Sequence, residues 1–286
     1  MECRKIPPDA RGKCVMTQEK PMQSYDHYKT IKCERDGRIM TVTFNRPDQL
    51  NATDAVLHRE ASRIFTDLSY DDDVDVIVLT GAGKAFSAGG DVNWMQDGID
   101  EPTRFERTAR EARDIVFSML DMEKPVICMM NGHAIGLGAT IALLCDIIIA
   151  SDRAKVGDPH VLMGLVAGDG GAVLWPQNVG YAKAKYYLMT GDLMTAEEAE
   201  RIGLITKVVP ADQLEAEAYG LAKRIASGPL KAISWTKISV NLQLKAAMHA
   251  SFDAGIAYET VSNVSFDHQE AVNAFRDKRE PQFTGR

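Results

Sequence analysis

Two glycine-rich segments of the chain carry residue types suited to binding a ligand oxygen. In residues 81–95, a strand pattern ends at the small-residue corner Ala88-Gly89-Gly90, which leaves backbone amides free to face a ligand. Asp91 is expected to cap the helix that follows. Residues 124–146 repeat this order, with Gly136-Leu137-Gly138 before an apolar helix. Two corners that each present an amide predict a two-amide oxyanion hole, although close backbone packing would also use such glycines.

A third segment, residues 156–171, places Asp158, His160 and Asp169 among apolar neighbours. Titratable side chains are costly to bury unless they are paired. An acid–base unit and a purely structural cluster both fit this pattern. The nine-residue spacing of His160 and Asp169 crosses two glycines, so a helix-then-turn reversal can bring the two side chains together.

Alternating apolar patterns and helical periodicity predict the elements that would position these segments. Strands are expected at residues 38–45, 74–81, 125–130, 146–150 and 204–209, and helices at 55–68, 104–120, 138–144, 211–225 and 244–261. This order is typical of an α/β fold with several parallel strands. We divide the chain into a polar tail (residues 1–24), an α/β core (25–209) and a helical C-terminal region (210–286).

Composition narrows the function classes. The 286 residues carry 33 basic and 40 acidic side chains and a formal net charge of −7, which argues against a general nucleic-acid-binding protein. No apolar run reaches the roughly 18 residues of a membrane span, and the tail lacks the apolar centre of a signal peptide. The five cysteines show no CxxC spacing. A disulfide framework and a metal site are therefore not expected. The cysteine pattern favours the reducing cytoplasm as the compartment of the protein.

Three motifs in order carry a family resemblance: KAFSAGGDVNWM, then NGHAIGLGATIALLCD with VGDPHVLMGLVAGDGG, then LMTGDLMTAEEAERIGLITKVV. They resemble the crotonase superfamily, the enoyl-CoA hydratase/isomerase family, over residues 28–286. The resemblance implies a spiral of ββα repeats, C-terminal helices that pack a homotrimer or hexamer, and a pocket for an acyl-CoA thioester. Coenzyme A would be part of the substrate, and no cofactor would be tightly bound.

The resemblance also assigns roles to residues. The amides of Gly90 and Leu137 would form the oxyanion hole. Thr140 and His160 stand where family hydratases carry their two water-activating glutamates, and both would be catalytic together with Asp169. Five residues would contact substrate: Lys84, Ala88, Asp91, Trp94 and Gly136.

The His160–Asp169 pair also resembles that of the oxocamphor-hydrolase type, in the pattern PH…GDG…WP. Asp169 would then orient His160 and favour its imidazolium form. The leading hypothesis is an acyl-CoA enzyme that stabilises an enolate, with a β-diketone carbon–carbon hydrolase as the alternative. A non-catalytic binding protein on the same fold is a third possibility.

Remaining features have simpler interpretations. His133 is expected in a turn and His268 at the surface. Leu244, Met248, Phe252 and Ile256 form an apolar stripe at i, i+4 spacing. The stripe either faces another subunit or packs on the chain's own core.

Overall fold

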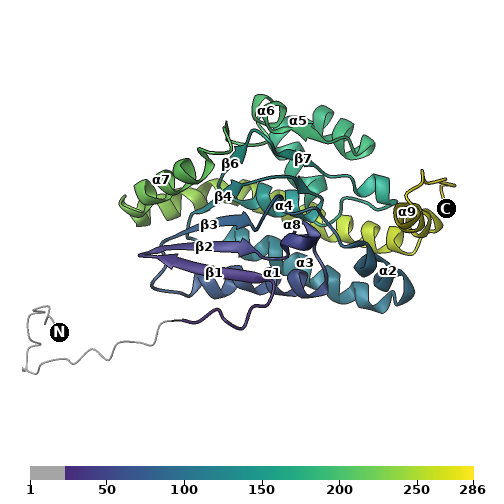
Figure 1. The fold of residues 1–286 in the computed structure, drawn as a ribbon, viewed down its shortest axis with the longest axis horizontal. Helices are drawn as coiled ribbons and strands as arrows, with labels where there is room; N and C mark the ends of the chain where they lie inside the picture. Colours follow the sequence, from purple (N-terminus) through teal and green to yellow (C-terminus); the bar gives the residue numbers. More distant parts are fainter. Residues whose placement is uncertain (1–22) are drawn as a thin grey trace, which may run out of the picture.

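The computed structural model describes residues 23–286, so the predicted tail lies outside the described residues except for its last two. A six-stranded sheet crosses the molecule in the order β1-β2-β3-β4-β6-β9, and a smaller sheet has the order β5-β7-β8. Helices cover both faces of the larger sheet (Figure 1).

The strands of the larger sheet are β1 (Ile31–Asp36), β2 (Ile39–Phe44), β3 (Val76–Gly81), β4 (Val126–Met130), β6 (Ile147–Ser151) and β9 (Lys207–Val209). Those of the smaller sheet are β5 (Ala134–Ile135), β7 (Lys155–Gly157) and β8 (Met194–Thr195). The helices are η1 (Pro47–Gln49), α1 (Ala55–Ser69), α2 (Val92–Asp100), α3 (Thr103–Asp121), α4 (Leu137–Leu144), η2 (His160–Met163), α5 (Gly171–Thr190), α6 (Ala196–Arg201), α7 (Leu214–Ala226), α8 (Leu230–Asn263) and α9 (Phe266–Asp277).

Strand direction brings the functional segments to one edge. β1 and β2 form an antiparallel hairpin, and every further pairing in the larger sheet is parallel. The carboxyl ends of β2, β3 and β4 therefore point the same way, toward α2 and α9 (Figure 1). The loops after β3 and β4 are the two glycine corners, so the fold gathers them at this edge.

The period-2 alternation of the strands builds two cores. Ile39, Val76, Val78, Ile127 and Ile149 face α7, and the intervening strand residues face α1, α3, α4 and α8. β3 is buried on both faces, as its continuous apolar run predicts.

Most predicted elements are confirmed, with shifted ends. The expected strand 204–209 is only three residues long, and α8 begins at Leu230 and runs for 34 residues. β1 was not predicted, because charged residues alternate along an edge strand that is exposed on one side. α5 was not predicted either, because Pro176 and a non-helical Gly180 interrupt its pattern.

The structure decides between the two interpretations of the α8 stripe and corrects the expected position of His268. On the α8 stripe, Met248 and Phe252 are fully buried, and Leu244 and Ile256 pack against the same core, so the stripe faces the chain's own interior. His268, expected at the surface, is buried, because α9 packs against η2. Its Nδ1 lies 2.6 Å from the carbonyl oxygen of Met163, the last residue of η2. Within residues 23–286, no helix is long and apolar enough to cross a bilayer.

Candidate active site

The two glycine corners lie side by side at the carboxyl edge of the sheet. The Ile135 amide donates to the Ser87 carbonyl at 3.0 Å, and Ser87 also pairs with Ala134 in an isolated bridge. Gly89 has φ +89°, and a Cβ on it would lie 3.2 Å from the Ile135 carbonyl oxygen. Glycine permits both this φ and this approach, which brings the two loops into contact.

Gly90 and Leu137 line one inner cavity. Leu137 is the first residue of α4, whose N-terminus has no side-chain cap, so its amide is one of the unpaired donors of a helix start. Gly90 follows Gly89, whose carbonyl accepts from the Thr53 amide at 2.7 Å. Among the described residues neither the Gly90 nor the Leu137 amide has an acceptor, so both are available to a ligand oxygen.

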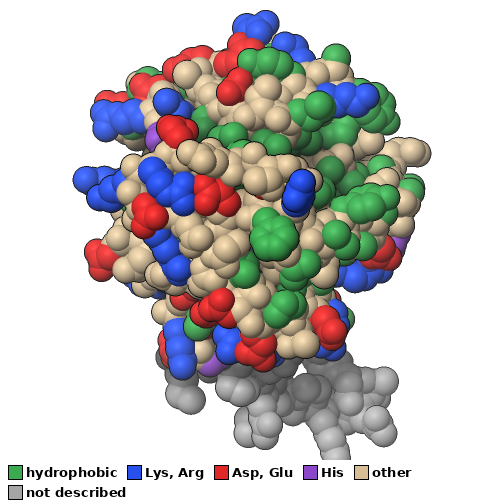
Figure 2. Space-filling model, turned by 90° about the vertical axis from the view of Figure 1, so that its right-hand side faces the viewer, with side chains coloured by type: hydrophobic (Ala, Val, Ile, Leu, Met, Phe, Trp, Pro, Cys, Tyr) green, Lys and Arg blue, Asp and Glu red, His purple; other side chains and the backbone are tan. Residues whose placement is uncertain are grey.

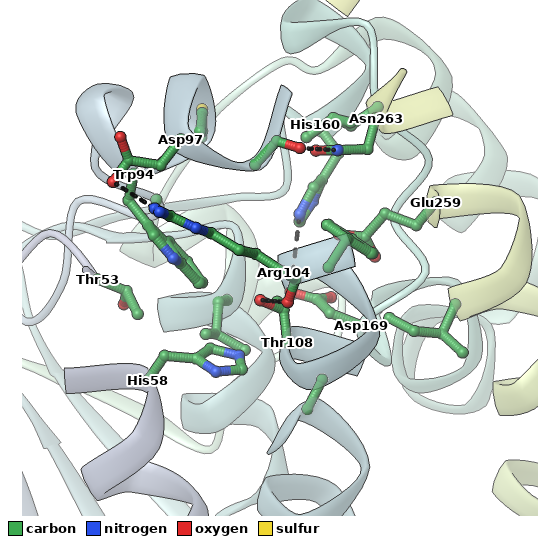
Figure 3. A pocket seen from close by; sticks show the side chains of 18 residues that line it. Thr53, His58, Trp94, Asp97, Arg104, Thr108, His160, Asp169, Glu259 and Asn263 are labelled. Atoms are coloured by element: carbon green, nitrogen blue, oxygen red, sulfur yellow. Dashed lines mark hydrogen bonds and ion pairs between the residues drawn. The ribbon is translucent and has the colours of Figure 1, made fainter. Parts of the chain in front are cut away.

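A second, outer cavity adjoins the first. The inner cavity (Figure 3) has a volume of about 90 Å³ and the outer one about 460 Å³. Gly90, Met95, His160 and Leu165 line both. A ligand whose reacting carbon lies at this junction would extend one arm into each cavity.

The predicted substrate-contacting residues divide between the cavities, with one exception. Ala88, Asp91 and Gly136 line the outer cavity and Trp94 the inner one. Asp91 also caps α2 as expected, by accepting from the Asn93 amide at 2.9 Å. Lys84 is exposed and lines neither cavity, because the turn that carries it faces solvent.

His160 lies between two carboxylates. Its Nδ1 is hydrogen-bonded to Asp158 Oδ1, and its Nε2 is 3.7 Å from Asp169 Oδ2. Burial alone would lower the pKa of His160, but the charges of Asp158 and Asp169 outweigh burial and hold that pKa well above its ordinary value. The site therefore favours the imidazolium. Asp158, which was not expected to contact His160, holds the Nδ1 side of the ring, and Asp169 faces the Nε2 side.

Asp169 is buried at the end of the loop that follows η2. Thr140 on α4 donates to Asp169 Oδ1 at 3.1 Å. Burial raises the pKa of Asp169, and the charge of His160 opposes that rise. Thr140 lines neither cavity, so the structure puts its hydroxyl behind Asp169 rather than against a ligand.

Glu259 completes the titratable cluster and was missed by the sequence analysis. It comes from α8, lines the inner cavity and is buried, and its Oε2 has no partner among the described residues. Burial raises the pKa of Glu259 to about 8, so the neutral acid predominates near pH 7. The helical spacing could have identified it, because Glu259 follows Ile256 by three residues and so lies on the same, buried side of α8.

The cluster has the composition of a metal site as well. One ligand atom from each of Asp158, His160 and Asp169 lies within 4.8 Å of the others. However, Asp158 already uses the Nδ1 of His160, and Asp169 faces its Nε2. Mutual pairing of charges therefore accounts for the arrangement without a cation.

His133 lies in the turn after β4, as predicted, where its Nδ1 accepts from the Lys155 amide at 3.2 Å. Cys128 and Cys145 are buried in the core, which confirms their expected packing role.

Comparison with known proteins decides the family. Residues 34–286 match the family model described as enoyl-CoA hydratase/isomerase. The chain belongs to the enoyl-CoA hydratase/isomerase family. Its members act on CoA thioesters, and the α/β fold with two mixed sheets and C-terminal helices is theirs. The predicted crotonase resemblance is therefore confirmed in fold and family.

Individual relatives differ in the reactions that their names state. The chain is 37% identical over 268 residues to a probable enoyl-CoA hydratase of Mycobacterium bovis, covering 91% of this chain and 99% of that protein. It is 34% identical to the 1,2-epoxyphenylacetyl-CoA isomerase of Escherichia coli, with 87% and 95% covered. An enoyl-CoA hydratase/isomerase structure from Mycobacterium paratuberculosis superposes with a TM-score of 0.83 at 36% identity, over 89% and 99% of the two chains.

Proposed function

We propose that this enoyl-CoA hydratase/isomerase family enzyme binds an acyl-CoA thioester and catalyses a reaction that passes through an enolate. The observation that carries the proposal is the pair of unpaired amides, Gly90 and Leu137, beside His160 at the junction of the two cavities. The thioester oxygen would accept from both amides, with the acyl group in the inner cavity and the CoA arm in the outer one. Fixed amides stabilise the developing negative charge without reorganisation, and each is worth about 3–4 kcal/mol of barrier.

Proton transfer would pass through the pair of His160 and Asp169. The ionised Asp169 would take a proton from the α-carbon or from an attacking water, and the His160 imidazolium would return a proton to the enolate. Glu259, which stays neutral near pH 7, would add a second donor to the same cavity. Thr140 would fix the orientation of Asp169.

This arrangement differs from the two-glutamate hydration chemistry that the family resemblance implies. Thr140 and His160 would replace the two glutamates, and a threonine hydroxyl has too high a pKa for ordinary acid–base work. General acids and bases each contribute roughly 10²–10⁴-fold. We therefore expect crotonyl-CoA hydration to be weak or absent. A rate typical of a hydratase would require another base, of which Asp169 is the first candidate.

The alternative is a β-diketone carbon–carbon hydrolase. The approach of His160 Nε2 to Asp169 at 3.7 Å favours it, because the pair holds a base and a proton donor side by side. Asp169 would take a proton from the water that attacks the ketone, and the His160 imidazolium would give a proton to the fragment that leaves. One carbonyl of the diketone would then occupy the Gly90–Leu137 amide pair, and the enolate of the other fragment would leave.

The deciding experiment incubates the pure protein with a panel of acyl-CoA thioesters and a panel of β-diketones, with products identified by mass spectrometry. Conversion of thioesters alone, accompanied by measurable CoA affinity, supports the first reaction. Cleavage of diketones alone would replace it with the second.

A further inference from the structure

Polar groups also line the inner cavity across from the proton-transfer cluster. Figure 3 shows Thr53 and His58 on one side of this cavity, with His160, Asp169 and Glu259 on the other. Thr53 precedes α1 and His58 lies in its first turns. Neither residue takes part in the enolate chemistry proposed above, so their presence needs a separate explanation.

Thr53 offers an unused hydroxyl. Its backbone is fixed beside the glycine corner, because its amide donates to Gly89 and its carbonyl accepts from Asp91. The residue is 3% exposed, yet its hydroxyl has no hydrogen-bond partner among the described residues. A hydroxyl in this setting can donate one hydrogen bond and accept others.

His58 is held with one nitrogen engaged. Its Nδ1 lies 2.9 Å from Glu111 Oε2, and Glu111 also accepts from Arg107 at 2.9 Å. Burial alone would raise the pKa of Glu111, but the hydrogen bonds from His58 and Arg107 outweigh it and lower that pKa. Glu111 is therefore an acceptor, and Nδ1 of His58 carries the proton. The Nε2 atom has no partner in the described part of the chain, and in the neutral ring it is an acceptor.

An unsubstituted alkyl chain would leave both groups unpaired. The ring of Trp94 packs against His58 with the centroids 5.1 Å apart, so the two lie in an enclosed wall of the cavity. Covering an unpaired polar group costs about 1–3 kcal/mol. A ligand hydroxyl would satisfy both residues at once, because it accepts from Thr53 and donates to His58. A ketone could satisfy only Thr53.

The charges around this wall favour a neutral substituent over a carboxylate. Arg104 lines the cavity and already pairs with Glu101 at 2.6 Å and with Asp97 at 3.7 Å. His160, the other positively charged group in this lining, lies between Asp158 and Asp169. The negative charge of Glu111 lies directly behind His58. Among the described residues that line this cavity, a ligand carboxylate would meet no unpaired cation, and its desolvation would go uncompensated.

We propose that Thr53 and His58 form a specificity site for a hydroxyl group carried by the acyl chain beyond its reacting carbons. This inference rests on the proposed binding of an acyl-CoA thioester. It narrows the substrate class to hydroxyacyl-CoA thioesters whose hydroxyl lies beyond the β-carbon.

The test compares kcat/KM for acyl-CoA thioesters of equal length that carry hydrogen, hydroxyl, ketone or carboxylate at successive carbons beyond the β-carbon. We expect the wild-type protein to prefer one hydroxyl isomer over its unsubstituted analogue by about tenfold or more. Thr53→Val, which keeps the shape and removes the hydroxyl, should reduce that ratio severalfold, and His58→Phe should do the same. The ratio is internal to each variant, so a general loss of folded protein does not change it.

Thr236→Val is the matched control, because Thr236 is an exposed α8 residue whose hydroxyl, within residues 23–286, bonds only to the Ala232 carbonyl. It should keep the wild-type ratio. Turnover of thioesters with no preference for any hydroxyl isomer, or with preference for the carboxylate, would overturn this site and leave the enolate reaction standing. Absence of turnover and binding for every thioester would overturn both.

Discussion

At the scale of residues, the chemistry depends on how His160, Asp158 and Asp169 share their charges. The two carboxylates engage opposite nitrogens of one imidazole, so the ring is fixed in orientation and kept protonated. When catalytic groups act as one unit, substituting one of them lowers activity about as much as substituting all of them.

His160→Ala and Asp169→Asn are each expected to lower kcat by about 10²–10⁴-fold on the thioester that the panel identifies. The double variant should lose little more than either single one. Steady-state kinetics of the three variants and the wild type measure this. Near wild-type turnover in either single variant would leave the pair with a packing role only.

Glu259 predicts a pH dependence of stability. Burial raises the pKa of Glu259 to about 8 in the folded protein, whereas the unfolded chain releases the same proton near the ordinary value. The favourable contribution of the protonated group is complete below the unfolded pKa and is lost as pH rises toward 8. The slope for one proton approaches about 1.4 kcal/mol per pH unit.

Glu259→Gln should therefore flatten the decline of unfolding free energy between about pH 5 and 8, as measured by urea denaturation across that range. Glu280→Gln removes an exposed carboxylate and should keep the wild-type profile. Parallel profiles for the wild type and Glu259→Gln would mean that Glu259 is ionised in the folded protein.

At the scale of elements, the start of α4 sets the position of the Leu137 amide. Gly136 has φ +54° and ψ −124°, a conformation that residues with a Cβ rarely adopt. A Cβ there would lie 3.6 Å from His160 Cε1, so space alone does not forbid it. The backbone conformation is the constraint.

Gly136→Ala is expected to destabilise the fold by about 1–3 kcal/mol and to lower kcat as well, because relief of the strain would rotate the Leu137 amide. Gly37→Ala is the control: Gly37 also has positive φ, at +60°, and none of the described residues comes within 4 Å of its Cβ position. It lies in the β1–β2 turn, which lines neither cavity. It should lose stability but keep kcat. Equal kcat in both variants would contradict the role of the α4 start.

At the scale of the whole molecule, hydrophobic side chains remain on the surface. Figure 2 shows them among charged residues on the face at the α2 and α9 end. Val261, Phe266 and Phe275 are 70%, 76% and 64% exposed. Exposed apolar groups of this size are typical of partner surfaces.

The family resemblance implies a trimer or hexamer of the 31.5 kDa chain, and we expect such an assembly here. The contact would use this exposed surface, since the predicted α8 stripe is buried in the chain itself. Light scattering at micromolar concentration should report three or six times the chain mass, and Phe266→Asp should shift the distribution toward smaller species. A stable wild-type monomer would contradict the assembly.

The sequence by itself determined the features that depend on neighbouring residues. The alternation that buries β3, the Asp91 cap and the two glycine corners are local, because propensity, capping and backbone sterics act over a few residues. The reversal between His160 and Asp169 belongs to this class, since Gly164 ends η2 in the left-handed conformation.

Only the tertiary structure decided which side chains share the cavities. Glu259 lies about ninety residues after Asp169, and His58 lies well before both, so nothing in local pattern connects them. Helix packing alone brings α1 and α8 to the two sides of one cavity. The same packing turns the α8 stripe toward the chain's own core. An amphipathic pattern predicts that one helix face is buried, but it does not identify the surface that covers this face. The position of Lys84, in a solvent-facing turn that lines neither cavity, was also decided by the tertiary structure.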